Sequence, residues 1–156
     1  MNLLRGGLLL VIGVLLGLVG QALVTSVQYP AGNNVIERSS PQDRIPEQDI
    51  EVYPDRVIIN LEGAQWARFA DTNSMDPIID RGTNAIQIAP KSMDDVEVGD
   101  IISYQSGERI IIHRVIEKAI DEQGWYVIAK GDNNPTADAT KVRFEQITRV
   151  LVAVIY

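Results

Sequence analysis

The chain has 156 residues, with 21 acidic side chains against 14 lysines and arginines, and its formal net charge is −7. This balance argues against a nucleic-acid-binding protein, because phosphate contacts need clustered cations, which the sequence lacks. Cysteine is absent, which excludes disulfides and thiolate chemistry, and a single histidine disfavours a zinc site. We therefore expect no metal or organic cofactor, and the length suits one compact domain plus an anchor.

The N-terminal part of the chain contains an uncharged, mostly apolar run of nineteen residues at positions 6–24. A bilayer-spanning helix needs about 20 such residues, so we expect a transmembrane anchor over residues 1–26. A cleavable secretory signal has an apolar region of roughly 7–15 residues, and Gln21-Ala22 offers a poor cleavage site, so a retained anchor is favoured. Arg5 precedes the run, which predicts a single-pass membrane protein with a cytoplasmic N-terminus and an extracytoplasmic domain.

The remainder of the chain divides into a polar arm and a β-rich domain. Residues 27–55 are rich in Pro, Asn, Ser and charges without periodicity, which predicts a linker or an irregular arm. Beyond it, Ser106-Gly107 predicts a hairpin turn, and residues 74–80 are the one short helical candidate. Short runs of β-branched residues between turn-forming residues predict strands at 56–61, 85–89, 100–104, 110–117, 125–129 and 147–156. Residues 56–156 are thus expected to form a mainly β domain, a small coiled sheet or partly open barrel.

Two segments of this domain carry residue types suited to acyl transfer. The segment 72–77, Thr-Asn-Ser-Met-Asp-Pro, offers Ser74 as a nucleophile, although the same pattern also fits a helix N-cap. A serine needs a positioned base near neutral pH, and the only histidine, His113, lies in a long apolar run. Strand alternation would place His113 on the same face as Ile111 and Val115, where a partly apolar surround keeps the imidazole neutral.

The order of the motifs resembles the signal peptidase I family, in its archaeal and endoplasmic-reticulum branch, where histidine replaces the lysine base of bacterial members. Four motifs follow one another in the family order: Ser-Met-x-Pro at 74–77, Gly-Asp-Ile-Ile at 99–102, His-Arg-Val at 113–115 and Gly-Asp-Asn-Asn at 131–134. The resemblance spans residues 69–156 and implies a β catalytic domain. Asn73 stands where the family often has glycine, and asparagine tolerates a positive φ better than most residues.

The resemblance also implies a role for each site residue. Ser74 would be the nucleophile and His113 the general base, while Asp138 would orient the imidazole. Asp132 would be a supporting acid, although on residue type alone it also suits a turn before a proline. The side chain of Thr72 and the backbone N–H of Ser74 would bind the oxyanion.

The activity that the resemblance implies is that of a membrane-bound serine endopeptidase, which removes signal peptides from secretory precursors after small residues. Its partners would be secretory precursor proteins, the lipid bilayer and, where needed, accessory membrane subunits. Two other functions also fit the sequence. One is a non-catalytic, membrane-anchored β module that binds partners, and the other is a Ser–His protease that cleaves one dedicated substrate or itself. The sequence leaves open whether the domain faces the cell surface or the lumen of the endoplasmic reticulum.

Overall fold

A computed structural model describes residues 37–156, and the anchor expected over residues 1–26 lies outside this range. Within the described range, no helix is both long and apolar enough to cross a bilayer. The described strands form two antiparallel sheets, which confirms the mainly β prediction, and these sheets do not close into a barrel.

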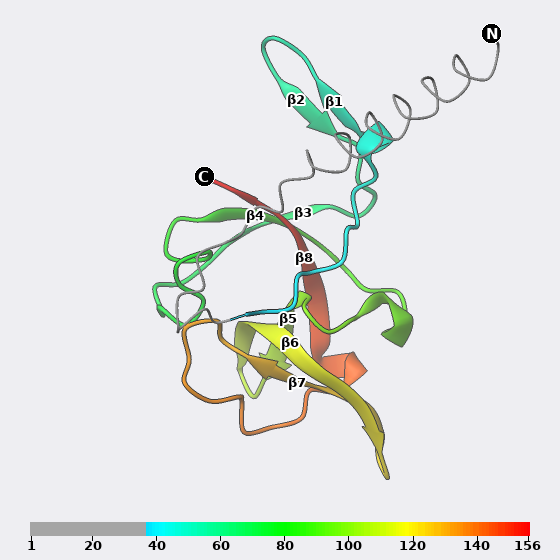
Figure 1. Ribbon diagram of the computed structural model, residues 1–156, viewed down its shortest axis with the longest axis vertical. Helices are drawn as coiled ribbons and strands as arrows, with labels where there is room; N and C mark the ends of the chain where they lie inside the picture. The colour runs from blue at the N-terminus through cyan, green and yellow to red at the C-terminus, as the bar shows by residue number, and fades with distance from the viewer. Residues whose placement is uncertain (1–36) are drawn as a thin grey trace, which may run out of the picture. The chain divides into compact units, whose positions relative to one another are not determined.

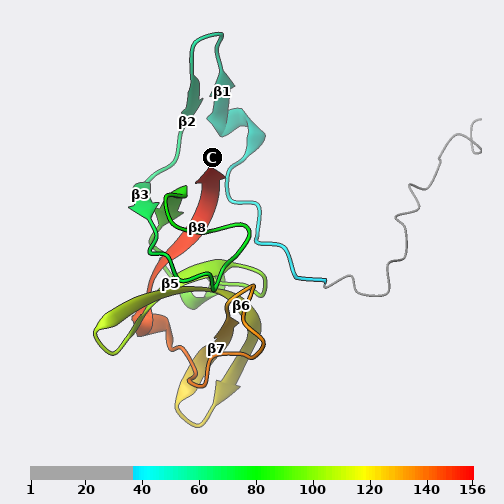
Figure 2. The same ribbon diagram turned by 90° about the vertical axis from the view of Figure 1, so that its left-hand side faces the viewer.

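The larger sheet has six strands in the order β3-β4-β8-β5-β6-β7 (Figure 1). Its strands are β3 (Gln65–Arg68), β4 (Asn84–Ile88), β5 (Ile101–Ser106), β6 (Arg109–Asp121), β7 (Gly124–Lys130) and β8 (Ile147–Ile155). The smaller sheet pairs β1 (Ile50–Val52) with β2 (Val57–Ile59). Three short 3₁₀ helices complete the described elements: η1 (Glu47–Asp49), η2 (Met93–Asp95) and η3 (Phe144–Gln146). Figure 2 shows the β1–β2 hairpin extending away from the six-stranded sheet.

The six strands predicted from β-branched runs are all present, with bounds that differ by a few residues. Strands β1 and β3 were not predicted, because β1 lies within residues 27–55, whose polar composition predicts an irregular arm, and β3 (Gln-Trp-Ala-Arg) has no β-branched residue. The helix predicted at 74–80 is wrong. The chain there makes a turn, in which the carbonyl of Met75 accepts hydrogen bonds from the N–H groups of Ile78 and Ile79. Asp76 precedes Pro77, and a residue before proline is disfavoured in the helical region.

The arm predicted over residues 27–55 is bound to the domain where the structure describes it. The buried carboxylate of Asp100 forms an ion pair with the guanidinium of Arg44. Gly99 brings the two segments into close approach, since a Cβ at this position would lie 2.1 Å from the carbonyl oxygen of Ser40. The polar composition that predicts a linker therefore supplies ion-pair and backbone contacts that hold the arm against the sheet.

The hairpin of β5 and β6 sets the register that later positions the site. The turn predicted at Ser106-Gly107 is confirmed, because Ser106 pairs with Arg109 and Gly107 has a positive φ of 60°. Further from this turn, Tyr104 of β5 pairs with Ile111 of β6. Ile102, two residues before Tyr104, pairs with His113. Residues directly opposite each other in an antiparallel pair share a face, so Tyr104 and His113 project from the same side of the hairpin.

Two groups of buried apolar side chains lie against the six-stranded sheet. One contains Tyr104 and Val115, with Ile111 packed against it, so the predicted face of Ile111 and Val115 is a core face. The other contains Met75 and Ile79, and Ile112 packs against it. Successive residues of β6 thus point into different groups, as strand alternation requires. The members of the first group are Val96, Ile102, Tyr104, Val115, Val127, Ala129, Val142, Ile147 and Val150.

Candidate active site

Ser74 lies on the turn that leads from β3 towards β4, and its position is fixed by its neighbours on both sides. Asn73 has a φ of 55°, a left-handed conformation that asparagine adopts more readily than most residues. Met75 is only 2% exposed and belongs to the buried core. Ser74 thus lies half-buried between a residue in the left-handed conformation and a residue anchored in the core.

The loop 131–134 holds the backbone of this turn from the other side. The N–H of Asn133 donates a 2.9 Å hydrogen bond to the carbonyl of Ser74, and the Asn133 side-chain amide donates a 2.9 Å bond to the carbonyl of Asn73. Gly131 is packed so closely that a Cβ there would lie 2.6 Å from the Ser74 carbonyl oxygen. The Gly-Asp-Asn-Asn motif thus supports the position of Ser74 through backbone contacts.

The predicted oxyanion groups lie together beside Ser74. The hydroxyl of Thr72 is 3.2 Å from the Ser74 hydroxyl, within hydrogen-bond distance. The N–H of Ser74 donates no hydrogen bond to any residue of the range 37–156. An N–H and a hydroxyl without other strong partners are able to stabilise a negatively charged oxygen that forms next to the serine.

His113 and Asp138 form the closest acid–base pair of the site. The Nδ1 atom of His113 lies 2.7 Å from Oδ2 of Asp138, and the histidine is only 7% exposed. Asp138 is positioned by its own N–H, which donates a 2.9 Å bond to the carbonyl of Ala129 on β7. The tautomer in which Nδ1–H donates to the carboxylate leaves Nε2 as the nitrogen that can accept a proton.

Tyr104 is a site residue that the sequence reasoning missed. Its hydroxyl donates a 2.6 Å hydrogen bond to the same Oδ2 atom of Asp138. Burial, the hydrogen bond and the charge of Asp138 raise the pKa of Tyr104 well above its ordinary value, so the hydroxyl stays a donor at neutral pH. The register set by the Ser106-Gly107 turn is the signal that would have identified it.

The second predicted acid, Asp132, binds a different partner. Its carboxylate forms a bidentate ion pair with Arg114, at 2.8 and 2.7 Å, and both side chains are buried. Arg38 from the arm contacts Asp132 as well, with its Nε atom 3.5 Å from Oδ1. Asp132 therefore connects the arm and β6 to the loop that supports Ser74. Of the two acids, Asp138 is the one that contacts the imidazole.

Ser74, Thr72 and His113 all line one cavity of about 650 Å³. Within the described residues, the Ser74 hydroxyl is hydrogen-bonded to Thr72 and not to the imidazole. Catalytic hydrogen bonds are often formed only in the substrate complex, so a shared cavity is compatible with a Ser–His pair. The other residues that line the cavity are Ala67, Arg68, Phe69, Ala70, Met75, Ile79, Gln87, Ser103, Arg109, Ile110, Ile111, Ile112, Asn134, Thr148 and Arg149.

Comparison of the chain with protein-family models, with curated proteins and with solved structures gives no match. Across residues 37–156, no group of three or more histidine, aspartate and glutamate side chains is placed to hold a metal ion.

Proposed function

We propose that this protein is a membrane-bound serine endopeptidase of the signal peptidase I type, with Ser74 as nucleophile and His113 as general base. The observation that carries the proposal is the arrangement around one cavity: Ser74 and Thr72 on one side, and a histidine whose Nδ1 is bound to Asp138 on the other. A buried imidazole held in one tautomer by a carboxylate is the arrangement that activates a serine hydroxyl.

The first chemical step would transfer the Ser74 proton to His113. The Nε2 atom accepts the proton as Oγ of Ser74 attacks the carbonyl carbon of the scissile peptide bond. The carbonyl oxygen becomes an oxyanion, which accepts hydrogen bonds from the Ser74 N–H and the Thr72 hydroxyl. Asp138 stabilises the imidazolium, which then protonates the leaving amine as the C–N bond breaks. A water molecule, deprotonated by His113, hydrolyses the acyl-enzyme and restores Ser74.

The substrate would bind as an extended segment along β3. This strand is at one edge of the six-stranded sheet, so its outer backbone groups have no strand partner within that sheet. Its residue Ala67, with Phe69 and Ala70 just beyond it, lines the cavity beside Ser74. Addition of a peptide strand to a sheet edge is a common mode of peptide recognition. Small side chains near the scissile bond are the specificity expected of such a protease, with secretory precursors as substrates.

The anchor proposed at residues 1–26 would hold the enzyme beside membrane-bound precursors and so raise their effective concentration. In this orientation the N-terminus is cytoplasmic and the catalytic domain is extracytoplasmic. Accessory membrane subunits would be further partners if the purified chain alone did not cleave precursors.

The test is cleavage of a precursor by the full chain in detergent or liposomes, with Ser74→Ala and His113→Ala in parallel. We expect cleavage after a small residue by the wild type and its loss in both variants. Equal cleavage by wild type and Ser74→Ala would eliminate the proposed nucleophile. A folded wild type that cleaves no member of a precursor panel and is not labelled by a serine-directed acylating reagent would favour the binding module.

A further inference from the structure

The cavity beside Ser74 has an unusual charge distribution for this acidic protein. Of the 13 described lysines and arginines, nine form ion pairs, and the four without one are Arg68, Arg109, Lys130 and Arg149. Three of these four, all arginines, line the cavity, whereas no aspartate or glutamate lines it. The unneutralised positive charge of the domain is thus concentrated where the substrate would lie.

The three arginines come from three different strands, and two of them are held at the cavity by contacts with neutral side chains. Arg149 on β8 donates a 2.7 Å hydrogen bond from Nε to the side chain of Gln65. Arg68, the last residue of β3, has its guanidinium 5.7 Å from the centre of the Trp66 ring. Arg109 is the first residue of β6 and is exposed. These contacts do not neutralise the positive charges, since Gln65 and Trp66 are uncharged.

The remaining walls of the cavity strengthen the field of these charges. Apolar residues, among them Phe69 and Ile79, line much of its surface. A cleft that combines charges of one sign with low-dielectric walls concentrates oppositely charged ligands. Arginine binds a carboxylate through two parallel N–H donors, which adds geometric selectivity to the attraction.

We infer that the site prefers peptides with carboxylate side chains close to the scissile bond, which Arg68, Arg109 and Arg149 would bind. This inference rests on the proposed peptidase function and defines its substrate class more narrowly. A signal sequence is largely apolar, so the carboxylates would lie in the polar flank of the cleaved segment. The preference would restrict the enzyme to a subset of precursors.

The experiment measures peptide binding separately from cleavage. Full-length Ser74→Ala in neutral detergent is titrated against fluorescein-labelled 12-residue peptides with two central alanines. Two flanking positions, on either side of the centre, carry Glu, Gln or Lys, and binding is followed by fluorescence anisotropy. We expect Glu peptides to bind about tenfold more tightly than Gln peptides, since each partly exposed ion pair contributes a factor of a few. This preference should weaken in high salt.

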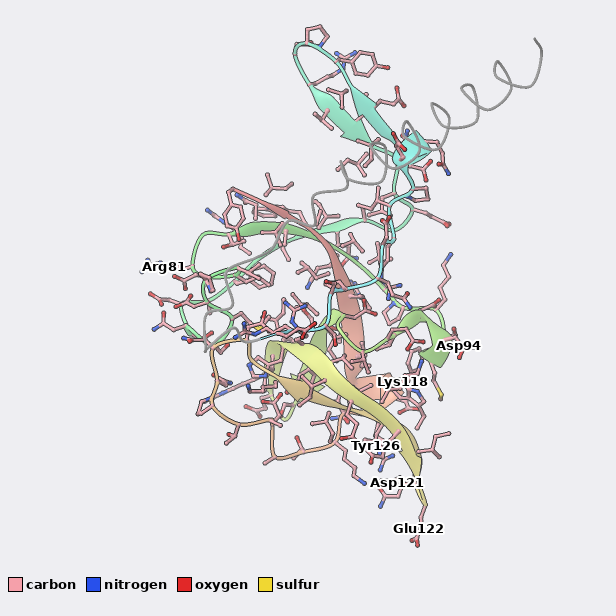
Figure 3. All side chains as sticks on the ribbon, viewed as in Figure 1. Arg81, Asp94, Lys118, Asp121, Glu122 and Tyr126 are labelled. Carbon is pink, nitrogen blue, oxygen red and sulfur yellow. The ribbon has the colours of Figure 1, made fainter. Side chains whose placement is uncertain are left out.

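Arg109→Glu and Arg68→Glu, each made in the Ser74→Ala chain, should abolish the preference for Glu over Gln. The matched control is Arg81→Glu, which makes the same change in net charge. Arg81 does not line the cavity, and Figure 3 places it at the outer edge of the molecule. The control should keep the preference. Equal binding of Glu and Gln peptides by the parent Ser74→Ala chain would overturn the inference. So would a control variant, Arg81→Glu, that reduced the preference as much as Arg109→Glu and Arg68→Glu.

Cleavage of the same peptides by the wild type separates this inference from the proposed function. Cleavage of Glu and Gln peptides at equal kcat/KM would overturn the acidic preference and leave the peptidase intact. Binding preference in Ser74→Ala without any cleavage by the wild type would support the cationic site and contradict the peptidase. Sedimentation with anionic and zwitterionic vesicles tests whether the arginines bind a lipid surface instead of a peptide. If Arg109→Glu weakens binding to anionic vesicles and leaves peptide binding unchanged, the arginines bind a lipid surface and the inference is wrong.

Discussion

Tyr104 and His113 bind the same carboxylate oxygen. The tyrosine hydroxyl and the histidine Nδ1 lie 2.6 and 2.7 Å from Oδ2 of Asp138, and they come from neighbouring strands of one hairpin. Two groups on one oxygen fix the carboxylate in position beside the imidazole. Asp138 is thus the acid whose loss should affect chemistry most directly.

Asp138→Asn should lower kcat about ten-thousandfold, as loss of the orienting aspartate does in Ser-His-Asp proteases. The amide N–H of asparagine would donate to Nδ1, so the proton would move to Nε2 and the base would be lost. Steady-state kinetics on a cleaved precursor measures the effect, and circular dichroism checks that the fold is retained. A loss below about tenfold would mean that Ser74 and His113 act as a dyad without this acid.

Tyr104→Phe should lower kcat by about tenfold and leave KM nearly unchanged. The variant keeps the buried ring but removes one hydrogen bond to an ionised group, which contributes about 1.5–3 kcal/mol. Because Tyr104 would act by positioning Asp138, its effect should largely disappear when Asp138 is already Asn. A double-mutant cycle of Tyr104→Phe and Asp138→Asn tests this. If the losses of kcat in the two single variants simply added up in the double variant, the positioning role would be contradicted.

Asp132→Asn should affect stability more than chemistry. Removal of the carboxylate leaves the buried Arg114 guanidinium without its bidentate partner, and breaking a buried pair on one side costs about 3–5 kcal/mol. The free energy of unfolding in urea should fall accordingly, while kcat of the folded fraction changes far less than in Asp138→Asn. If Asp132→Asn left stability unchanged and abolished turnover, the assignment of the two acids would have to be exchanged.

Gly131→Ala should impair the proposed nucleophile, Ser74, by displacing its backbone. The new Cβ would lie 2.6 Å from the Ser74 carbonyl oxygen, a separation that requires the turn to shift. A displacement of about 1 Å at a reacting group can cost about a hundredfold in rate. Labelling of Ser74 by an acylating reagent reports the effect. Labelling of Gly131→Ala at the wild-type rate would mean that the turn accommodates the new Cβ without displacing Ser74.

The strands could be predicted from sequence because β-branched runs are a local signal. The turn at 74–80 could not, because the helical pattern around Pro77 competes with long-range contacts. Among these is the hydrogen bond from Asn133 to Ser74, which joins residues far apart in the chain. Ordering of the arm depends likewise on Asp100, a charge buried by residues distant in sequence.

For the candidate site, the order of the motifs indicated Ser74 and His113, the family resemblance indicated Asp138, and the geometry separates the two acids. Asp132 and Asp138 are equivalent by residue type and lie only six positions apart. Their partners differ because Arg114 and His113, adjacent on β6, point to opposite faces of the strand. Arg114 pairs with Lys130 on β7, two residues before Asp132, whereas the N–H of Asp138 binds the carbonyl of Ala129.

Asp121→Asn should make the stability of the fold less sensitive to acid. Arg143 and Lys141 bind the Asp121 carboxylate, at 2.9 and 2.6 Å, and hold its pKa well below the usual range. A carboxyl with a depressed pKa in the folded state contributes stability above its unfolded pKa of about 4, which is lost as the pH falls further. The variant should therefore unfold at a lower temperature at pH 7, and this difference should shrink below about pH 4.

The matched control is Glu122→Gln, since Glu122 is the next residue at the tip of the β6–β7 hairpin and is exposed (Figure 3). Within the described residues Glu122 forms no ion pair, so this variant should follow the wild-type pH profile. The Asp121 side chain is 24% exposed, and partly exposed pairs contribute little, so the expected change is small. Thermal unfolding between about pH 2 and 7 measures it. A difference between wild type and Asp121→Asn that stays constant over this range would mean that the ion pair does not contribute to acid sensitivity.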